Sequence, residues 1–317
     1  MKQIKTIGII GMGNVGNCIF DFIQEKYNSN NSLNTKHLQI LWICSKHFNK
    51  NINPIKIFNE ISEIDTNSEK NIPDLIIIGK TDKNIEATSN ELTQKFNYLI
   101  KDKFIIHLSG TFGTELLSEC KKYSAKVVAA HPFQTFFSKE AKCLKNISWG
   151  IECEKNDEKK FAEFIKKLNG EPYFLTDNTL KYKGLYHSIS VCASNYISAS
   201  IMLANLISEE IQINQLKFLK PIINQTVENF SIFFEKHLND KSKFPLSGPI
   251  PRADFATIEK HLNDLQEISE KNHNKFLLNS YSHFGFGLLE IAKSTNKITD
   301  ENYNKFKEIF NKFLENN

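Results

Sequence analysis

The 317-residue sequence has no stretch of about 18 consecutive apolar residues, the length that a membrane-spanning helix requires. Its first residues lack the long apolar segment and the small-residue cleavage site of a secretory signal. Excess positive charge is also scarce: 40 Lys and Arg against 36 Asp and Glu leave a net charge of +4, with no dense basic block. We therefore expect a cytoplasmic protein that binds neither a membrane nor nucleic acid.

Cysteine is sparse and irregularly spaced. The six cysteines show neither the CxxC nor the Cys/His spacing of a zinc site, and lie at positions 18, 44, 120, 143, 153 and 192. Scattered cysteines are typical of reduced thiols in a cytosolic protein, so we expect no metal site. The remaining composition, 40% hydrophobic and 24% charged, is that of a globular protein, and the length suits two domains.

Strand and helix signals alternate in the first half of the chain. Polar, helix-like segments such as Asn84–Ile100 and Thr114–Tyr123 separate short apolar runs, which are typical of strands buried on both faces of a parallel sheet. These runs are Ile4–Ile10, Leu38–Cys44, Leu75–Gly79, Phe104–Leu108 and Lys126–Ala130. The alternation predicts an α/β fold, a Rossmann-type doubly wound parallel sheet, over residues 1–176. Weaker signals add edge strands near Trp149–Glu152 and Pro172–Leu175, with a helix at Glu158–Leu168.

Strand signals disappear after residue 176, and residues 177–317 are predicted to form an all-α domain. Helical periodicity covers Leu180–Ser208, Asn214–Leu238, Asp254–Ser269, Asn272–Lys293 and Glu301–Leu314. The apolar faces through Phe218–Phe234 and Phe276–Ile291 are larger than one monomeric domain needs. They predict a homodimer formed through the helical domain, with packing inside the domain as the alternative.

A glycine-rich segment follows the first predicted strand and opens a helical pattern. In this context its GxGxxG spacing predicts dinucleotide binding, because the glycines allow a tight turn, close approach of a pyrophosphate, and packing of helix on strand. The helix N-terminus would add free N–H groups and positive potential. A tight turn without a ligand is the alternative. The segment consists of Gly11, Met12, Gly13, Asn14, Val15 and Gly16.

The end of the second strand predicts which dinucleotide is bound. NAD enzymes place an acid there to accept hydrogen bonds from the ribose 2′-hydroxyl, but this sequence has Ser45, Lys46 and His47. Ser45 and Lys46 suit a 2′-phosphate and favour NADP, although Lys46 and His47 are also typical of an exposed loop. Residues past the third and fourth strands are expected to line the same cofactor: Gly79, Lys80, Thr81, Ser109 and Gly110.

Polar residues form a stripe on the first helix of the second half. At about 100° per residue, Lys183, His187, Ser190 and Ser194 lie within roughly 60° of one another, with Asn195 on the flank. The residues around them are apolar or small, so we expect a mostly buried helix whose polar groups contact a substrate between the domains. The alternatives are a satisfied core histidine, serines bonded to their own helix, and a lysine that reaches water.

Two further groups of polar residues are candidates for the site. Asp254 is expected to cap the helix that follows it. Arg252 and Asp254 either pair with each other and fix their loop, or bind substrate. His131 and Gln134 follow the fifth strand and are expected on the opposite wall of the site.

The chain resembles a family of Rossmann-fold oxidoreductases with a C-terminal helical domain of unknown function, similar to pyrroline-5-carboxylate reductase and β-hydroxyacid dehydrogenases. The resemblance covers nearly the whole chain and is carried by GMGNVG, HLSG, AAHPFQTF, WGIE, KGLYHSISVCASNY and SGPIPRADFATIEKHL. One branch of the family is similar to an alternative ketopantoate reductase of pantothenate biosynthesis. The broader superfamily pairs a Lys with an Asn four residues on; here Lys183 takes the first position and His187 the second.

Residues and resemblance together predict an NADPH-dependent reductase of a small 2-oxo acid, with ketopantoate as the first candidate. Lys183 or His187 would donate the proton. Ser190, Ser194 and Asn195 would hold the carboxylate or hydroxyl of the substrate. The competing hypothesis is an NADP-binding sensor or interaction protein that catalyses no reaction.

Overall fold

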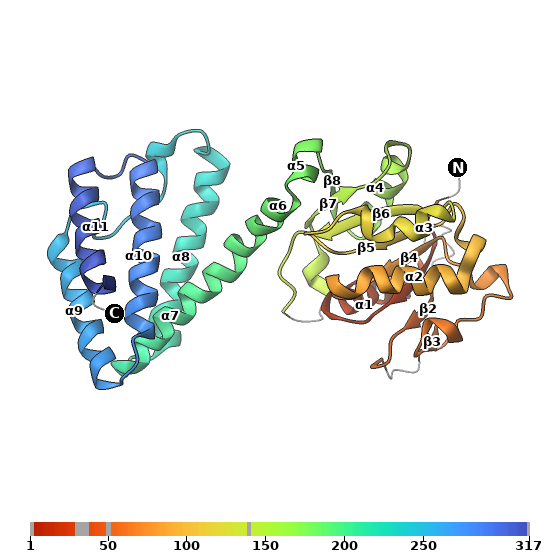
Figure 1. Ribbon diagram of the computed structural model, residues 1–317, viewed down its shortest axis with the longest axis horizontal. Coiled ribbons are helices and arrows are strands. Elements are labelled where there is room, and N and C mark those ends of the chain that lie inside the picture. The colour runs from red at the N-terminus through yellow and green to blue at the C-terminus, as the bar shows by residue number, and fades with distance from the viewer. Residues whose placement is uncertain (1–2, 29–37, 49–51, 138–140, 316–317) are drawn as a thin grey trace. The chain divides into compact units, whose positions relative to one another are not determined.

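The computed structural model describes residues 3–28, 38–48, 52–137 and 141–315 (Figure 1). The chain divides into two compact units, Met1–Ser194 and Asn195–Asn317, which we call the α/β unit and the helical unit. The last strand ends at Phe174, close to the expected domain boundary at residue 176. The boundary between the compact units falls later, inside a helical segment that starts at Lys183.

The α/β unit contains one eight-stranded sheet in the order β3-β2-β1-β4-β5-β6-β7-β8. Its strands are β1 Thr6–Ile10, β2 Gln39–Cys44, β3 Lys56–Phe58, β4 Leu75–Ile78, β5 Phe104–His107, β6 Lys126–Pro132, β7 Ser148–Glu152 and β8 Glu171–Phe174. All neighbouring strands are parallel except β6 and β7, which pair antiparallel with His131 opposite Gly150. The predicted fold class, a Rossmann-type sheet followed by helices, is confirmed.

Both faces of the central strands are buried, as their continuous apolar sequence predicts. Along β4, Leu75 and Ile77 face one core, whereas Ile76 and Ile78 face another, and all four are fully buried. The first core includes residues of α1 (Asn14–Asn28) and α4 (Glu158–Lys167), and the second includes residues of α2 (Ile85–Phe96) and α3 (Ser118–Lys122). Side chains alternate along a strand, so a strand needs apolar residues at every position when helices cover both faces.

The second half of the chain is entirely helical among the residues described. Its helices are α5 Asp177–Lys181, α6 Lys183–Ser190, α7 Ile197–Glu210, α8 Gln215–Lys236, α9 Phe255–Lys271, α10 Phe276–Ser294 and α11 Asp300–Glu315. Leu262 of α9, Leu289 of α10 and Phe306 of α11 belong to one buried cluster. Between α6 and α7 the backbone is π-helical over Val191–Tyr196, so the single regular helix expected over Leu180–Ser208 is interrupted.

The helical segment Lys183–Glu210 is long and apolar enough to cross a membrane by length and composition alone, and only 6% of its most apolar window is buried. Leu185, Ile189 and Ile197 are 67%, 58% and 48% exposed. The sequence predicted a mostly buried helix, whereas these three apolar side chains are exposed.

Candidate active site

The glycine loop forms a turn in which backbone packs on backbone. Gly11 has a φ of +90°, a conformation that favours glycine, and its N–H donates to the Cys44 carbonyl at 2.9 Å. A Cβ atom on Gly11 would lie 2.7 Å from the Gly79 carbonyl oxygen. A Cβ on Gly16 would lie 2.5 Å from the Gly11 carbonyl oxygen. The turn and the packing of α1 therefore require Gly11 and Gly16.

Gly13 is not required in this way. A Cβ there would meet only the Gly79 oxygen, at an ordinary 3.8 Å, so the protein leaves room for a side chain. A group that approaches the backbone from outside explains a glycine at this position, and a dinucleotide pyrophosphate is such a group. The helix α1 begins at Asn14, and its N-terminal N–H groups supply positive potential. The loop therefore fits a pyrophosphate.

The remaining side chains of the loop contact the protein. The Asn14 amide donates to the Phe136 carbonyl at 2.7 Å, and the Asn17 amide donates to the Met12 carbonyl at 2.5 Å. Met12 and Val15 pack against the core of the sheet. Any contribution of Met12, Asn14 and Val15 to a bound dinucleotide would thus come from the backbone that these contacts hold in place.

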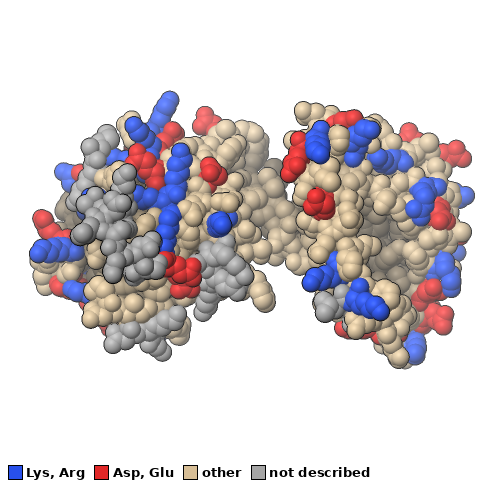
Figure 2. Space-filling view, turned by 180° about the vertical axis from the view of Figure 1, so that it is seen from behind, with Lys and Arg blue, Asp and Glu red and all other residues tan. Residues whose placement is uncertain are grey.

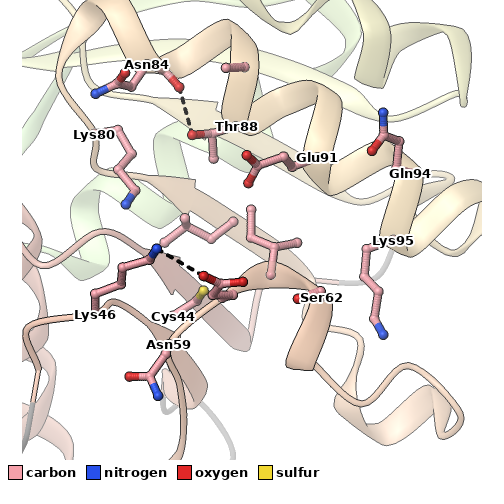
Figure 3. A pocket seen from close by; sticks show the side chains of 14 residues that line it. Cys44, Lys46, Asn59, Ser62, Lys80, Asn84, Thr88, Glu91, Gln94 and Lys95 are labelled. Atoms are coloured by element: carbon pink, nitrogen blue, oxygen red, sulfur yellow. Dashed lines mark hydrogen bonds and ion pairs between the residues drawn. The ribbon is translucent and has the colours of Figure 1, made fainter.

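A cavity of about 690 Å³ lies at the carboxyl ends of β1, β2 and β4 (Figure 3). Ile10 and Cys44, the last residues of β1 and β2, line it together with polar residues from the following loops and from α2. Its charged lining residues have both signs: Lys46, Lys80, Lys95, Glu60 and Glu91. A cavity of this size and mixed lining, next to the glycine loop, suits the nucleoside part of a dinucleotide.

The predicted phosphate-binding residues behave differently from each other. Lys46 lines the cavity but lies 3.0 Å from Glu60, a pairing that raises the pKa of Lys46. Ser45 is buried, donates its N–H to the Phe58 carbonyl at 2.8 Å and is not among the residues that line the cavity. Glu60 follows β3, a short strand that sequence reasoning missed. The cavity therefore contains an acid, Glu60, in the loop two residues after the end of β3.

Of the residues predicted after β4, Lys80 lines the cavity and Gly79 belongs to the turn. A Cβ on Gly79 would lie 2.9 Å from the Gly11 carbonyl oxygen, so the close approach of the two loops requires glycine. The Thr81 hydroxyl accepts a hydrogen bond from the Asn84 amide at 3.0 Å. Thr81 thus shapes the loop at the entrance to α2.

A second group of side chains lies at the carboxyl ends of β5 and β6 and against β7, which runs antiparallel to β6. The imidazole centroids of His131 and His187 are 5.6 Å apart, and His131 Nδ1 is 3.2 Å from the Tyr186 hydroxyl. Gly110 lies against both imidazoles, because a Cβ there would be 2.7 Å from His187 Cδ2 and 2.9 Å from His131 Cε1. The structure therefore brings Gly110, predicted as a cofactor residue, together with two predicted site histidines. Sequence reasoning missed Tyr186, although it lies beside His187.

Burial sets the protonation states in this group. Burial, together with the neighbouring His187 and Lys183, lowers the pKa of His131 to about 4, so His131 is neutral at pH 7. Burial raises the pKa of Tyr186 to about 12, so its hydroxyl keeps its proton. The neutral imidazole of His131 and the protonated hydroxyl of Tyr186 can each donate or accept a hydrogen bond without carrying a charge.

Lys183 reaches this group from the first turn of α6 and pairs with a carboxylate that sequence reasoning did not single out. Its ammonium lies 2.9 Å from Glu152 Oε2, at the end of β7, and the two side chains are 10% and 18% exposed. Glu152 Oε1 accepts hydrogen bonds from the Thr114 N–H at 3.0 Å and the Thr114 hydroxyl at 2.8 Å. The WGIE segment contains this acid, but only the sheet shows that it faces Lys183.

His107 and Ser109 hold the backbone of the loop that follows β5. The fully buried His107 accepts the Ser109 N–H at Nδ1 and therefore donates from Nε2 to the Gly113 carbonyl, at 3.2 and 2.7 Å. Burial lowers the pKa of His107, which agrees with this neutral form. The Ser109 hydroxyl accepts the N–H groups of Thr111 and Phe112, both at 3.2 Å. Ser109, predicted to line the cofactor, thus fixes the turn after β5.

The polar stripe that begins with Lys183 and His187 on α6 is interrupted before α7 by the π-helical segment. Ser190 donates its hydroxyl to the His187 carbonyl at 2.7 Å, one of the alternatives for a helical serine. Ser194 and Asn195 lie in the π-helical segment, where the backbone no longer advances by 100° per residue. Ser194 is half-buried and Asn195 is exposed. The alignment of Ser194 with Lys183 and His187, which assumed a regular helix, is therefore not preserved.

The other predicted substrate residues have partners in their own loops, and Arg252 and Asp254 belong to the helical unit. The Gln134 amide oxygen accepts the Thr135 N–H at 2.8 Å, and its side chain is exposed. Asp254 caps α9, as expected, by accepting the Thr257 N–H at 3.2 Å and the Thr257 hydroxyl at 2.7 Å. Those hydrogen bonds lower the pKa of Asp254, and exposed Arg252 lowers it less.

Potential metal ligands do not gather anywhere in the described ranges: no three His, Cys, Asp or Glu side chains there form a group that could hold an ion. The six cysteines, all within those ranges, form no disulfide bond, and Cys18, Cys44 and Cys120 are buried. The candidate site consists of a nucleoside-sized cavity and a group of ionisable side chains along one edge of the sheet.

Comparison with protein-family models identifies a DUF2520 domain, described as a domain of unknown function, over residues 147–284. This range runs from the start of β7 into α10 and includes Glu152, Lys183 and His187. No curated protein sequence matches the chain.

Solved structures share the fold over most of the chain. A putative NADP oxidoreductase from Bacteroides fragilis is 16% identical, with 87% of this chain and 97% of that chain covered and a TM-score of 0.61. A pyrroline carboxylate reductase from Plasmodium falciparum, solved with NADP bound, is 15% identical, with coverages of 94% and 99% and a TM-score of 0.52. A reductive aminase from Aspergillus terreus in complex with NADPH is 12% identical, with coverages of 99% and 95% and a TM-score of 0.53.

These similarities confirm the Rossmann-type fold and part of the predicted resemblance. Residues 147–284 match the DUF2520 family model, and the structural neighbours include a putative NADP oxidoreductase and pyrroline-5-carboxylate reductases. The narrower resemblance to an alternative ketopantoate reductase stays a prediction.

Proposed function

We propose that the protein is an NADPH-dependent reductase of a small carbonyl compound. One observation carries the proposal: a single sheet edge bears, within the α/β unit, the glycine loop and cavity at β1, β2 and β4, and a buried group of ionisable residues at β5, β6 and β7. Ligands of open α/β sheets bind at this carboxyl edge. The NADP- and NADPH-bound structures with the same fold support the choice of cofactor.

The chain offers residues for each part of NADPH. The glycine loop and the N-terminus of α1 would hold the pyrophosphate, and Lys46 and Lys80 would face the 2′-phosphate. When bound, the nicotinamide supplies a hydride. Reduction of a carbonyl carbon by hydride leaves an alkoxide, which must receive a proton from the protein or solvent.

The group around Lys183 and His187 is suited to that second step. The ammonium of Lys183 can stabilise a developing negative charge, and His187 or Lys183 can supply the proton. Beside them, His131 and Tyr186 lie within hydrogen-bonding distance of each other, and both side chains are uncharged at pH 7. The Lys183 ammonium, which Glu152 holds in place, can also donate a hydrogen bond to a substrate carboxylate, and a small 2-oxo acid, with ketopantoate first, is the substrate that we propose.

An imine is the second candidate substrate. The specific observation in its favour is the set of structural neighbours, which includes pyrroline carboxylate reductase, imine reductase and reductive aminase. Ketopantoate and pyrroline-5-carboxylate therefore belong in the same assay, with NADPH oxidation followed by absorbance. A broad panel without turnover, despite NADPH binding, would favour the sensor hypothesis.

The catalytic assignment has a direct test. Lys183→Ala combined with His187→Ala is expected to lower kcat/KM at least about 100-fold, because both candidate proton donors and the fixed charge are lost. The Kd for NADPH, measured by fluorescence, is expected to change less than about threefold, since neither residue lines the nucleoside cavity. Unchanged turnover would contradict the assignment.

We also propose that the protein is a cytoplasmic homodimer formed through its helices. Between Gly184 and Ser208, the segment of α6 and α7, the sequence has no Asp, Glu, Lys or Arg. Figure 2 shows mainly uncharged surface in the middle of the chain, where the two units are joined. A second copy fits this surface better than lipid, because Lys183 at its start is ion-paired to the sheet and serines and asparagines recur along it. The helical unit adds an apolar groove of about 750 Å³ that includes Phe284, Leu288 and Ile291.

A further inference from the structure

We propose that Glu152 is a positioning residue that fixes the ammonium of Lys183, so that Lys183 acts as an immobile positive charge and leaves proton donation to its neighbours. The use of that charge in a reaction rests on the proposed function. The positioning itself rests only on contacts within the α/β unit.

The carboxylate of Glu152 is held on both of its oxygens. Oε1 accepts two hydrogen bonds from Thr114, one from the backbone N–H and one from the hydroxyl. Oε2 is thereby oriented toward the Lys183 ammonium at 2.9 Å. A carboxylate fixed by two donors gives its partner lysine one favoured position, which a mobile surface acid would not.

The chain between β5 and β6 is shaped around this carboxylate. A Cβ on Gly113 would lie 2.6 Å from Glu152 Oε2, so a side chain at Gly113 would displace the acid. Burial alone would raise the pKa of Glu152, but the hydrogen bonds from Thr114 and Lys183 lower it. Glu152 therefore stays ionised at neutral pH, which keeps the pair charged.

The histidines near the pair contribute no positive charge at pH 7, because burial lowers the pKa of both His107 and His131. The neighbouring Glu115 carboxylate has its own partner, the Gly113 N–H at 2.8 Å. If Lys183 gave up its proton, the charge of Glu152 would be left half-buried and unpaired, which is costly. The ion pair thus fixes the Lys183 ammonium in one position, and the proposal leaves proton donation to the neighbouring His187.

Competitive acylation of the lysines tests the positioning without any substrate. Only a free amine reacts, so the ion-paired and buried Lys183 is expected to react at least about tenfold more slowly than exposed Lys181, two residues away on the same peptide. Peptide mass spectrometry of the purified full-length protein gives both rates. Glu152→Gln is expected to raise the rate of Lys183 several-fold and to leave that of Lys181 unchanged, and Glu152→Asp is expected to restore part of the protection.

Three results would overturn the inference. They are a rate for Lys183 that Glu152→Gln does not change, equal acceleration of Lys181 and Lys183, which would indicate general loosening, and an absence of rescue by Glu152→Asp. The proposed function fails separately, when wild-type protein binds no dinucleotide or reduces no carbonyl or imine substrate. Where turnover is found, Glu152→Gln is expected to raise KM for an anionic substrate more than it lowers kcat.

Discussion

The two units of this chain bury their apolar residues to very different degrees. In the α/β unit, Ile7, Ile9 and Ile77 are fully buried between helices of the same unit. In the helical unit, Phe218, Ile222 and Phe234 of α8 are 59%, 64% and 59% exposed. The sheet therefore completes its core within one chain, whereas the helices retain a large uncovered apolar surface. Exposed apolar surface of this kind is typical of an interaction site, and a second copy of the chain is the partner that we propose.

The largest effect is expected at that uncovered surface. Ile222→Asp should convert the proposed dimer to monomers, because a carboxylate in the centre of an apolar interface would be buried without a partner. Size-exclusion chromatography with light scattering gives the mass. Tyr98→Asp is the matched control, since Tyr98 is 70% exposed on the α/β unit and should leave the mass unchanged. A wild-type monomer at micromolar concentration would contradict the dimer and sharpen the question of what covers α8.

Truncating a buried side chain in the α/β unit should cost more stability than truncating an exposed one in the helical unit. Ile77→Ala is expected to lower the free energy of unfolding of the α/β unit by about 2–5 kcal/mol, because it removes a fully buried side chain and leaves a cavity. Both tryptophans, Trp42 and Trp149, are buried in the α/β unit, so their fluorescence during urea unfolding reports on that unit. Ile222→Ala should shift the same transition by less than about 0.5 kcal/mol. Equal shifts would show that burial does not distinguish the units.

Acid should weaken the α/β unit through His131. Its pKa is near 4 when folded and near 6.5 when unfolded, so the unfolded chain binds more protons between these values and stability falls as the pH drops from about 6.5 to 4. The loss is on the order of 2 kcal/mol across this window. His131→Gln should reduce the loss, as measured by tryptophan fluorescence in urea at pH 7 and pH 5. An identical pH dependence in the variant would exclude His131 as its source.

The smallest effect concerns the choice of dinucleotide. Glu60 pairs with Lys46 in the cavity beside the glycine loop. If that cavity holds the 2′-phosphate as proposed, Glu60→Gln should free Lys46 and tighten NADPH about fivefold while weakening or sparing NADH. Titration of cofactor fluorescence gives both Kd values. Glu91→Gln is the control, because Glu91 lines the same cavity without an ion pair to Lys46 among the described contacts. A change of equal size for NADPH and NADH would show that Glu60 does not select between them.

The glycine loop illustrates what local sequence can predict. Strand, turn and helix follow one another in Ile4–Ile23, and the structure has β1, the turn at Gly11 and α1 in that order. The contacts are short-range, so the residue types alone carry the information. Capping of α9 by Asp254 was predictable for the same reason, since cap and capped N–H are three residues apart.

Long-range pairing limits the prediction elsewhere. The three-residue strand β3 has no periodicity to detect, and with it the Lys46–Glu60 pair was missed. Glu152 lies on β7, which pairs antiparallel with β6, and contacts Thr114 and Lys183, which are 38 and 31 residues away in sequence. The polar stripe failed at Ser194 because a π-helical segment, invisible in a 100° projection, changes the direction of the side chains.

The sequence alone determined the order of the longer strands and helices, the glycine turn and the division into an α/β half and a helical half, because these depend on local propensity and periodicity. The tertiary structure decided which charges meet. Strand order placed Glu152 against Lys183 and brought His131, Tyr186 and His187 together. Pair energies depend on distance and burial, and a sequence fixes neither of these until the sheet is assembled.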